Sequence, residues 1–472
     1  MKILIIHFRS APPSTFSNLD TPANDSAGTD GVSLEIKKRA TLLEEMSHQI
    51  SICSAYSWSD FPVPELEFDS EEVQRIMGNL FGLAGICDYP GEEQLRAAVE
   101  TAGQELEQRL GKVVDSFTPD LIFVHNILSL PVHPAATVAL ARLLEKTGIP
   151  CAAVHHDILG EGAYKFAATC PYARRLLDRY FPPHLPNLSH WVINSRNRRV
   201  LEKKGVAAGI IHDTMDFHHR MNEKERKILR QKLRQQHGLQ AEDIVLFVGC
   251  RLVPNKQIEI AGHLTVALQK ISGKLTGHRL YNGETFTEGN SVVLVLAGRP
   301  ERAFTEYRDK VFTLFDSLGI RYLYAGDRVR PVRLEERDLY ALYPDMYSMA
   351  DFVLYPTGWE GFGNQLLEAI VAELPAAVFE YPVFKEDIAP KGVKVVSLGD
   401  KIAASKDPSG LVRLEEDVFA QASGEIVGLL TSVDDYEKIV AHNFEVGEKH
   451  FDFTVLREHL MEEIKRAAQR GS

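Results

Sequence analysis

Short apolar runs alternate along the chain with longer stretches in which apolar residues recur at helical spacing. Ile3–His7 is a run of the first kind, and Leu34–Met46, which sets apolar residues among Glu and Lys, is a stretch of the second. Buried parallel strands are apolar throughout, whereas the apolar stripe of a helix repeats about every 3.6 residues. The alternation therefore predicts an α/β fold with parallel sheets that carry helices on both faces.

The expected elements form two series. The first comprises strands at Ile3–His7, Gln49–Ser54, Leu121–His125, Pro150–His155 and His190–Asn194, with helices at Leu34–Met46, Glu92–Phe117 and Ala135–Thr147. The second comprises strands at Ile244–Cys250, Val292–Ala297, Arg321–Ala325, Phe352–Tyr355, Ala376–Glu380 and Lys394–Ser397, with helices near Glu259–Leu275, Ala303–Leu318 and Leu339–Met349 and another from Asn364. Between them Arg220–His237 has the spacing of a solvated amphipathic helix, and the chain ends in a charged helical stretch, Phe453–Arg470.

Each series is long enough for a doubly wound domain, so we expect domains at 1–218 and 219–440 and a helical segment at 441–472. In open α/β sheets, ligands bind outside the carboxyl ends of the strands. Two such domains face to face would hold a ligand in the cleft between them. The chemistry is then expected on loops that follow strands.

Composition narrows the class of protein. The net charge of −12 argues against a nucleic-acid partner. The five cysteines are scattered and contain no C-x-x-C pair, which favours buried free thiols over a disulfide framework or a zinc site. No run approaches the roughly 18 apolar residues of a membrane span, so we expect a cytoplasmic protein without an integral membrane segment. The sequence leaves the oligomeric state open.

The most informative segment is Tyr355-Pro-Thr-Gly-Trp-Glu-Gly-Phe-Gly-Asn-Gln-Leu-Leu-Glu-Ala369, in which a strand, a glycine-rich loop and a helix follow one another. Gly361 and Gly363 allow backbone to approach a ligand closely, and the N–H groups of a helix start favour a diphosphate. Glu360 lies on the loop and Glu368 lies more than a turn into the helix. One carboxylate is therefore placed to accept hydrogen bonds from sugar hydroxyls, and the other is placed to reach a ribose.

Two further segments follow strands. Cys250–Lys256 carries Arg251 and Lys256, and two cations at the mouth of a parallel strand suit a diphosphate and its developing charge. His155-His156-Asp157 follows another strand. Adjacent residues rarely supply two metal ligands from one strand end, so hydrogen bonds to substrate hydroxyls are the favoured role of His156 and Asp157, and no metal is expected.

A fourth segment, Thr29–Glu35, lies between the first strand and the first helix. Gly31 permits close approach of a ligand, and the helix start points toward whatever binds there. Asp30, Ser33 and Glu35 are candidate acceptor-binding residues, although Asp30 or Ser33 is equally suited to be the N-cap of the helix.

Together these segments resemble glycosyltransferase family 4, whose members are retaining enzymes with the GT-B fold. Glu360-x7-Glu368 resembles the Glu-x7-Glu motif of the family, Arg251 and Lys256 resemble its phosphate-binding pair, and Gly31 and His156 stand where it has a glycine loop and an active-site histidine. The strings Asp30–Glu35, Glu360–Asn364 and Tyr381–Ile388 resemble a narrower branch that includes mannosylglucosylglycerate synthases. Two departures are Asp30-Gly31 in place of Gly-Gly and Ile211–Thr214 in place of Val-Pro-Asn-Gly.

The resemblance implies a hexosyltransferase with a nucleotide-sugar donor, GDP-mannose or UDP-glucose, and a small polar acceptor. It implies front-face displacement without a protein nucleophile, metal independence, and a terminal helix that packs back on the first domain. The donor site would include Gly361 and Phe362, and the N–H groups of Gly363, Asn364 and Gln365 would assist at the diphosphate. Two alternatives stay open on this pattern, a nucleotide-sugar epimerase and a non-catalytic nucleotide-sugar-binding protein.

Overall fold

The structure is a computed structural model that describes residues 1–10, 31–161, 166–330, 340–341, 345–403 and 409–470. The chain divides into two compact units. Unit 1 is Met1–Asp213 together with Thr454–Ser472, and unit 2 is Thr214–Phe453. The expected boundaries lie after 218 and 440, whereas the division into units falls after Asp213 and Phe453. At the second boundary, one helix, Val433–Phe451, runs unbroken through 440 and 441.

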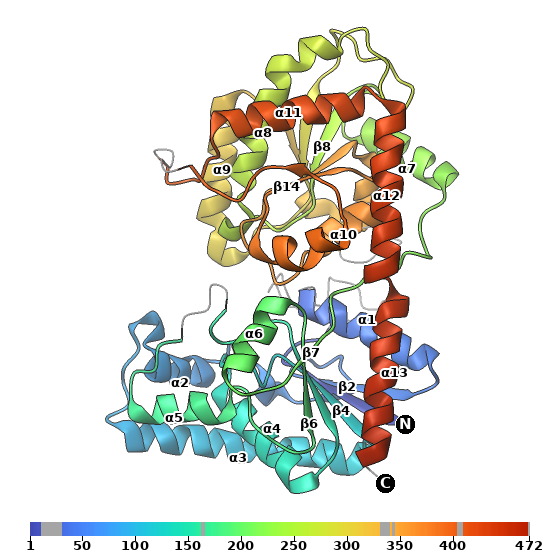
Figure 1. Ribbon diagram of the computed structural model, residues 1–472. Coiled ribbons are helices and arrows are strands. Elements are labelled where there is room, and N and C mark those ends of the chain that lie inside the picture. Colours follow the sequence, from blue (N-terminus) through green and yellow to red (C-terminus); the bar gives the residue numbers. More distant parts are fainter. Residues whose placement is uncertain (11–30, 162–165, 331–339, 342–344, 404–408, 471–472) are drawn as a thin grey trace. The chain divides into compact units, whose positions relative to one another are not determined.

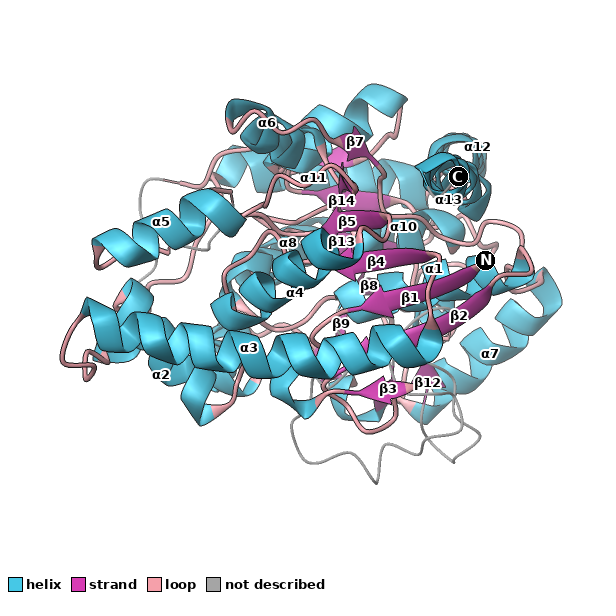
Figure 2. Ribbon diagram, turned by 90° about the horizontal axis from the view of Figure 1, so that it is seen from below, coloured by secondary structure: helices cyan, strands magenta, loops and turns pink. Residues whose placement is uncertain are grey.

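Unit 1 contains a seven-stranded sheet in the order β3-β2-β1-β4-β5-β6-β7, in which all pairs are parallel. Figure 2 shows β2, β1, β4 and β5 side by side in this order. The strands are β1 Lys2–Ile6, β2 Gln49–Ser54, β3 Phe61–Pro62, β4 Leu121–His125, β5 Cys151–His155, β6 Leu188–Val192 and β7 Gly209–Ile210. The helices are α1 Gly31–Glu45, α2 Glu71–Phe81, α3 Glu92–Phe117, α4 Pro134–Thr147, α5 Pro171–Tyr180, α6 Ser195–Lys203 and α13 Phe453–Arg470.

Unit 2 repeats the architecture with a parallel six-stranded sheet in the order β10-β9-β8-β13-β14-β15 (Figure 1). Its strands are β8 Ile244–Val248, β9 Val292–Leu296, β10 Tyr322–Tyr324, β13 Phe352–Tyr355, β14 Ala376–Val378 and β15 Val396–Ser397, and β11 Val329–Arg330 pairs separately with β12 Tyr340–Ala341. Its helices are α7 Glu223–Gln236, α8 Ile258–Ile271, α9 Thr305–Leu318, α10 Asn364–Val371, α11 Glu416–Leu430 and α12 Val433–Phe451.

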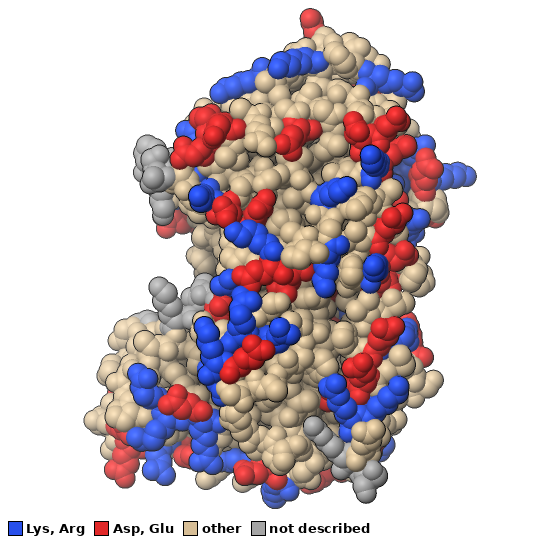
Figure 3. All heavy atoms as spheres, in the orientation of Figure 1, with Lys and Arg blue, Asp and Glu red and all other residues tan. Residues whose placement is uncertain are grey.

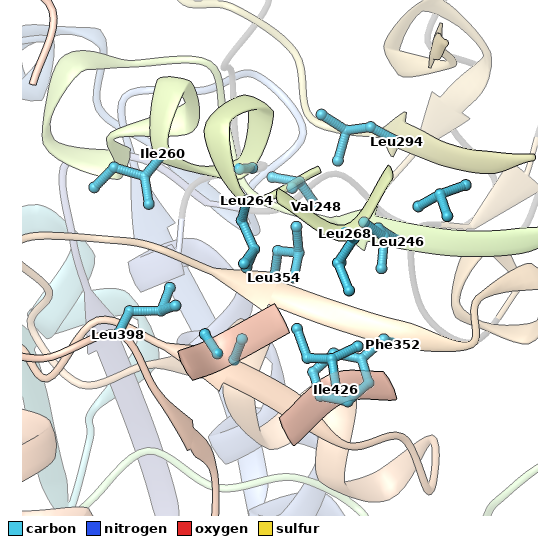
Figure 4. Close-up of a cluster of buried hydrophobic side chains, with 14 of the residues drawn as sticks. Leu246, Val248, Ile260, Leu264, Leu268, Leu294, Phe352, Leu354, Leu398 and Ile426 are labelled. Carbon is cyan, nitrogen blue, oxygen red and sulfur yellow. The ribbon is translucent and has the colours of Figure 1, made fainter. Parts of the chain in front are cut away.

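The core of unit 2 lies where α8 and α11 cover the apolar strands. Figure 4 shows side chains of β8, β9 and β13 meeting side chains of both helices, and the labelled residues are Leu246, Val248, Ile260, Leu264, Leu268, Leu294, Phe352, Leu354, Leu398 and Ile426. All ten are at most 2% exposed. Strands that are apolar on both faces need this cover, which is why the continuous apolar runs correctly predicted a parallel sheet.

α13 belongs to unit 1 through contacts with strands distant in sequence. Glu463 accepts hydrogen bonds from Trp191 Nε1 at 3.0 Å and from Ser189 Oγ at 2.6 Å, both on β6. Arg457 also forms an ion pair with Glu45 at the end of α1. The final helix is therefore an integral part of unit 1.

The predicted fold class is confirmed, and several predicted elements have the observed bounds, among them Gln49–Ser54, Glu92–Phe117 and Phe352–Tyr355. The helix expected near Leu339–Met349 is wrong: Tyr340–Ala341 is a strand, and Met346–Met349 is a 3-10 turn. The remaining residues of the expected helix, 339 and 342–344, lie outside the described residues. The strand expected at His190–Asn194 ends at Val192, because Asn194 is the N-cap of α6.

The surface carries mixed charge, and the cysteines are free thiols. Acidic and basic side chains are interspersed over the face seen in Figure 3. None of the described helices is long and apolar enough to cross a membrane. All five cysteines are free thiols, and Cys53, Cys151 and Cys250 are buried as expected, whereas Cys87 is exposed.

Candidate active site

Two loops of unit 2 lie side by side because they follow neighbouring strands. One follows β8 and the other follows β13, and these strands are paired in the sheet. Gly358 N–H donates to the carbonyl oxygen of Asn255 at 2.9 Å, and Asn255 Nδ2 donates back to the carbonyl oxygen of Trp359 at 3.2 Å. These bonds connect the basic loop with the acidic loop at the carboxyl edge of the sheet.

Lys256 and Glu360 form an ion pair across the two loops. The Lys256 side chain is 4% exposed and that of Glu360 is 15% exposed. Tyr355 Oη donates to the same oxygen, Glu360 Oε1, at 2.6 Å, and Thr357 Oγ1 lies 3.3 Å from it. Three donors on one carboxylate oxygen hold Glu360 in a single orientation, and each interaction is strengthened by burial.

The loop reaches α10 through Gly363, which has φ of 143°, a conformation that L side chains rarely adopt. A Cβ atom at Gly363 would lie 2.2 Å from Tyr381 Oη. That hydroxyl donates to the carbonyl oxygen of Phe362 at 2.7 Å. Glycine is therefore required here both by the backbone angle and by the close tyrosine, and the helix start at Asn364 presents the first N–H groups of α10.

Arg251 and Glu368 have partners of their own. Arg251 pairs with Glu301, and its side chain is 53% exposed. Glu368 accepts a hydrogen bond from Tyr347 Oη at 2.8 Å, and Gln365 Oε1 lies 3.3 Å from Tyr355 Oη. The structure thus brings Lys256 and Glu360 into direct contact, with Gln365 beside them, and leaves Arg251 on a separate ion pair.

Burial raises the pKa of Tyr355 and of Tyr381 well above the ordinary value, and the negative charge of Glu360 raises both further. Both phenols are therefore protonated at neutral pH. Each is a permanent hydrogen-bond donor to the acidic loop, one to a side chain and one to the backbone.

In unit 1, three histidines come at the carboxyl ends of adjacent strands. His7 follows β1, His125 ends β4, and His156 follows β5. His7 Nδ1 donates to the carbonyl oxygen of His125 at 2.8 Å, and His125 Nδ1 lies 3.0 Å from His156 Nε2. Burial lowers the pKa of His125 and His156 well below the ordinary value, and the positive charge of Arg39 lowers both further. Both rings are thus neutral at neutral pH.

The three residues His155-His156-Asp157 have three different partners. His155 Nε2 lies 3.0 Å from His190 Nδ1, whereas His156 contacts His125. Asp157 accepts a hydrogen bond from Asn126 Nδ2 at 3.0 Å. In the described ranges no group of three or more His, Cys, Asp or Glu side chains is arranged to hold a metal ion.

The fourth predicted segment, 29–35, begins outside the described residues, and Asp30 lies in that part. Gly31 is the first residue of α1, and no atom of the described residues lies within 4 Å of the position of a Cβ there. Ser33 is fully buried. Glu35 is also buried and forms ion pairs with Lys38 and Arg39.

Sequence reasoning missed His125, Asn126, Tyr355 and Arg39. His125 and Asn126 end the strand Leu121–His125, so the rule that chemistry follows strands, applied to every strand, would have found them. Tyr355 was read only as the end of a strand. Arg39 falls on the apolar stripe of α1 with Ile36 and Leu43, and a cation on the buried face of a helix is itself a signal.

Two parallel-sheet domains of this kind are the architecture of GT-B glycosyltransferases. Sucrose-phosphate synthase from Thermosynechococcus elongatus has the same fold, with a TM-score of 0.61 at 14% identity, over 100% of both chains. No family model matches the chain. The enzyme class is nevertheless defined by sequence relatives, and the chain is a glycosyltransferase.

The chain belongs to the family of mannosylglucosylglycerate synthases. It is 32% identical to the mannosylglucosylglycerate synthase of Thermotoga maritima over 467 residues, which cover 98% of this chain and 100% of the relative. It is 30% identical to the enzyme of the same name from Petrotoga mobilis, over 91% of this chain and 97% of the relative.

Proposed function

We propose that the chain is a retaining mannosyltransferase that joins mannose from a nucleoside-diphosphate mannose to glucosylglycerate. The names of both relatives describe a product with a mannosyl group on a glucosylglycerate unit. The single structural observation that supports the proposal most is the buried Lys256–Glu360 pair beside the start of α10. It places a cation for a phosphate next to a carboxylate for sugar hydroxyls. GDP-mannose is the proposed donor and UDP-glucose is the alternative.

Unit 2 is proposed to bind the donor. Lys256 and Arg251 would bind the diphosphate with the N–H groups of Gly363, Asn364 and Gln365. Glu360 would accept hydrogen bonds from the hexose, with Gly361 and Phe362 beside it, and Glu368 would accept from the ribose. Donor binding would replace the Lys256–Glu360 contact with two new ones, because phosphate is the better partner for the lysine and hydroxyl groups are donors for the carboxylate.

Unit 1 is proposed to bind the acceptor and to orient the transferred sugar. His156 and Asp157 would bind hydroxyls of that sugar, and the neutral His156 ring suits this role since it can donate or accept. Asp30, Gly31 and Ser33 would lie on the acceptor side. Glu35 would lie on the acceptor side as well, and its ion pairs with Lys38 and Arg39 support an indirect role there.

In the proposed reaction, the bond between C1 of the hexose and the phosphate oxygen breaks while an acceptor oxygen bonds to C1 on the same face. The acceptor hydroxyl proton passes to the departing phosphate oxygen. Lys256 and the helix-end amides stabilise the charge that develops on that phosphate, which is where preorganised donors contribute most. No protein nucleophile takes part, and Arg and Lys supply the charge stabilisation that a metal supplies elsewhere.

The test is to incubate the purified protein with glucosylglycerate and either GDP-mannose or UDP-glucose, and to identify the product by NMR. The proposal expects a mannosylated product with the α anomeric configuration of the donor. A β-linked product would contradict retention, and no product from either donor would contradict the function. Donor alone is the control for an epimerase, and added EDTA should leave transfer unchanged.

A thermal-shift series with GDP and UDP identifies the base independently. A ligand that binds only the folded protein raises its stability by an amount that grows with the logarithm of the ratio of ligand concentration to Kd. We expect GDP to raise the melting temperature more than UDP. The opposite order would favour UDP-glucose as the donor.

A further inference from the structure

One carboxylate of α1 lies between two cations. Glu35 Oε1 lies 2.5 Å from Lys38 Nζ, and Glu35 Oε2 lies 3.0 Å from Arg39 Nη1, which also donates to the carbonyl oxygen of Glu35 at 3.2 Å. The side chains of Glu35 and Arg39 are each 1% exposed. Charged side chains are almost never buried to this degree unless they are paired.

Arg39 is only half satisfied by this pairing. Its Nη1 makes both contacts with Glu35, whereas its Nη2 is buried and has no hydrogen-bond partner among the residues that the structure describes. A buried donor without a partner is costly, more so on a charged group. The guanidinium fork matches the two oxygens of a carboxylate, so the unused edge of Arg39 suits a planar monoanion.

Arg39 lies near two histidines at the carboxyl edge of the unit 1 sheet, the edge at which ligands bind in α/β folds. Its charge acts on His125 and His156, at the carboxyl ends of β4 and β5. Burial lowers the pKa of both rings, so they remain neutral and do not compete with Arg39 for an anion. His156 is also the residue proposed to contact the transferred sugar, so a ligand held by Arg39 would lie close to the reacting groups.

We propose that Arg39 binds the carboxylate of the glycerate group of the acceptor, and that it thereby selects an acidic acceptor over a neutral one. This inference rests on the proposed function, because glycerate is the part of that acceptor that carries a negative charge. Sugar hydroxyls offer hydrogen bonds but no charge. A single buried guanidinium is thus the feature that distinguishes a glycerate from a glycerol.

The decisive comparison is between glucosylglycerate and glucosylglycerol, which differ in a carboxylate against a hydroxymethyl group. We expect wild-type kcat/KM to favour the acid by roughly a hundredfold, the size of a buried charge-assisted contact. Arg39→Met should reduce this preference to within about threefold, mainly through the KM for the acid. Arg39→Lys, which keeps the charge but loses the fork, should restore part of it.

We expect Arg39→Met to fold, because Glu35 keeps Lys38 as a partner when Arg39 is removed. Arg142→Met is the matched control: it removes another Arg–Glu pair of unit 1, with Glu100, and should leave the preference at the wild-type value. Circular dichroism and a thermal melt check that each variant is folded.

Three outcomes would count against the inference. Equal losses for both acceptors in Arg39→Met would make the residue structural. If Arg39→Met raised the KM for the donor and left the KM for the acceptor unchanged, Arg39 would be assigned to the diphosphate. A wild-type enzyme without preference for the acid would overturn the inference with no variant needed. Transfer to neither acceptor would instead overturn the proposed function itself, which keeps the two failures distinct.

Discussion

The hydroxyl of Tyr355 lies 2.6 Å from Glu360 Oε1, the oxygen that also pairs with Lys256. Tyr355 is the last residue of β13 and is 1% exposed, so its hydroxyl is carried by a buried strand of the sheet. The loop carboxylate therefore takes its orientation from a buried strand. We regard Tyr355 as a positioning residue for Glu360.

Tyr355→Phe removes one hydroxyl and leaves the ring in the core. A hydrogen bond to a charged group contributes about 1.5–3 kcal/mol, so kcat/KM should fall roughly ten- to a hundredfold. The matched control is Tyr281→Phe, which removes the hydrogen bond of a partly buried tyrosine to another carboxylate of unit 2, that of Asp351. We expect the control to lower stability without lowering kcat/KM. Equal activity of Tyr355→Phe and wild type would remove the positioning role.

The contact between Lys256 and Glu360 predicts strong coupling in a double-mutant cycle. Lys256→Met and Glu360→Gln should each lower kcat/KM by at least about a hundredfold, because each removes a group that meets developing charge or the sugar. Residues that act as a unit are not additive, so the double variant should lose little more than either single one. Lys385→Met, which breaks an exposed pair with Asp400, is the control. Independent, multiplicative losses would show that the two side chains act apart.

Much of the fold was predictable because parallel strands are uniform in composition. β8 and β13 are apolar on both faces and stand out from their flanking segments. The helices α2, α5 and α6 were missed, since their sequences mix charge and apolar residues over 11, 10 and 9 residues. Short helices depend on tertiary packing more than on local propensity.

The site was predictable where one segment carries it, and less so where folding joins distant segments. Glu360 and Glu368 are eight residues apart and were found together. The partner of Glu360 is 104 residues away, and only the pairing of β8 with β13 makes that contact. No periodicity signals that Arg251 turns to Glu301, because an exposed ion pair leaves no pattern in the chain.

Asp351 predicts a large stability effect in unit 2 that is distinct from activity. Its carboxylate is 1% exposed and accepts from Arg234 Nη2 at 2.6 Å and from the backbone of Val245 at 2.7 Å, besides a contact with Arg230. Burial alone would raise the pKa of Asp351, but the two arginines outweigh it and lower that pKa. Removing one partner of a buried ionic cluster leaves unpaired charge inside the protein.

We therefore expect Asp351→Asn to lower the free energy of unfolding by about 3–5 kcal/mol. Hydrogen exchange of peptides from α7 and β8, followed by mass spectrometry, measures this locally. Asp309→Asn, which breaks an exposed pair with Arg308, should cost no more than about 1 kcal/mol. A loss of similar size in both variants would contradict a special role for the buried cluster.

Buried neutral histidines predict that unit 1 weakens in mild acid. Burial lowers the pKa of His133 to about 4 and that of His190 to about 4, against about 6.5 for an exposed imidazole. Burial also lowers the pKa of His125, His155 and His156 well below the ordinary value. The unfolded chain thus binds more protons than the folded unit below pH 6.5, so the stabilisation present above pH 6.5 is lost as pH falls toward 4.

His133→Asn tests this with a single group. Asparagine keeps a side-chain acceptor for the N–H of Ala136 at the start of α4 but cannot take up a proton. Hydrogen exchange of α4 peptides between pH 6.5 and 4.5, corrected for the intrinsic rate, should show a steep loss of protection in the wild type. The free energy of opening of α4 should fall less steeply with decreasing pH in the variant. The difference between the two slopes should be at most about 1.4 kcal/mol per pH unit, the effect of one proton.

The control variant is His278→Asn, which removes an exposed histidine of unit 2. It should leave the pH dependence of protection in unit 1 at its wild-type value. Because several histidines contribute, the wild-type slope should exceed that of a single proton, and His133→Asn should reduce it without abolishing it. Protection of α4 that is independent of pH down to 4.5 would contradict the prediction. It would show that these imidazoles take up protons in the folded unit as readily as in the unfolded chain.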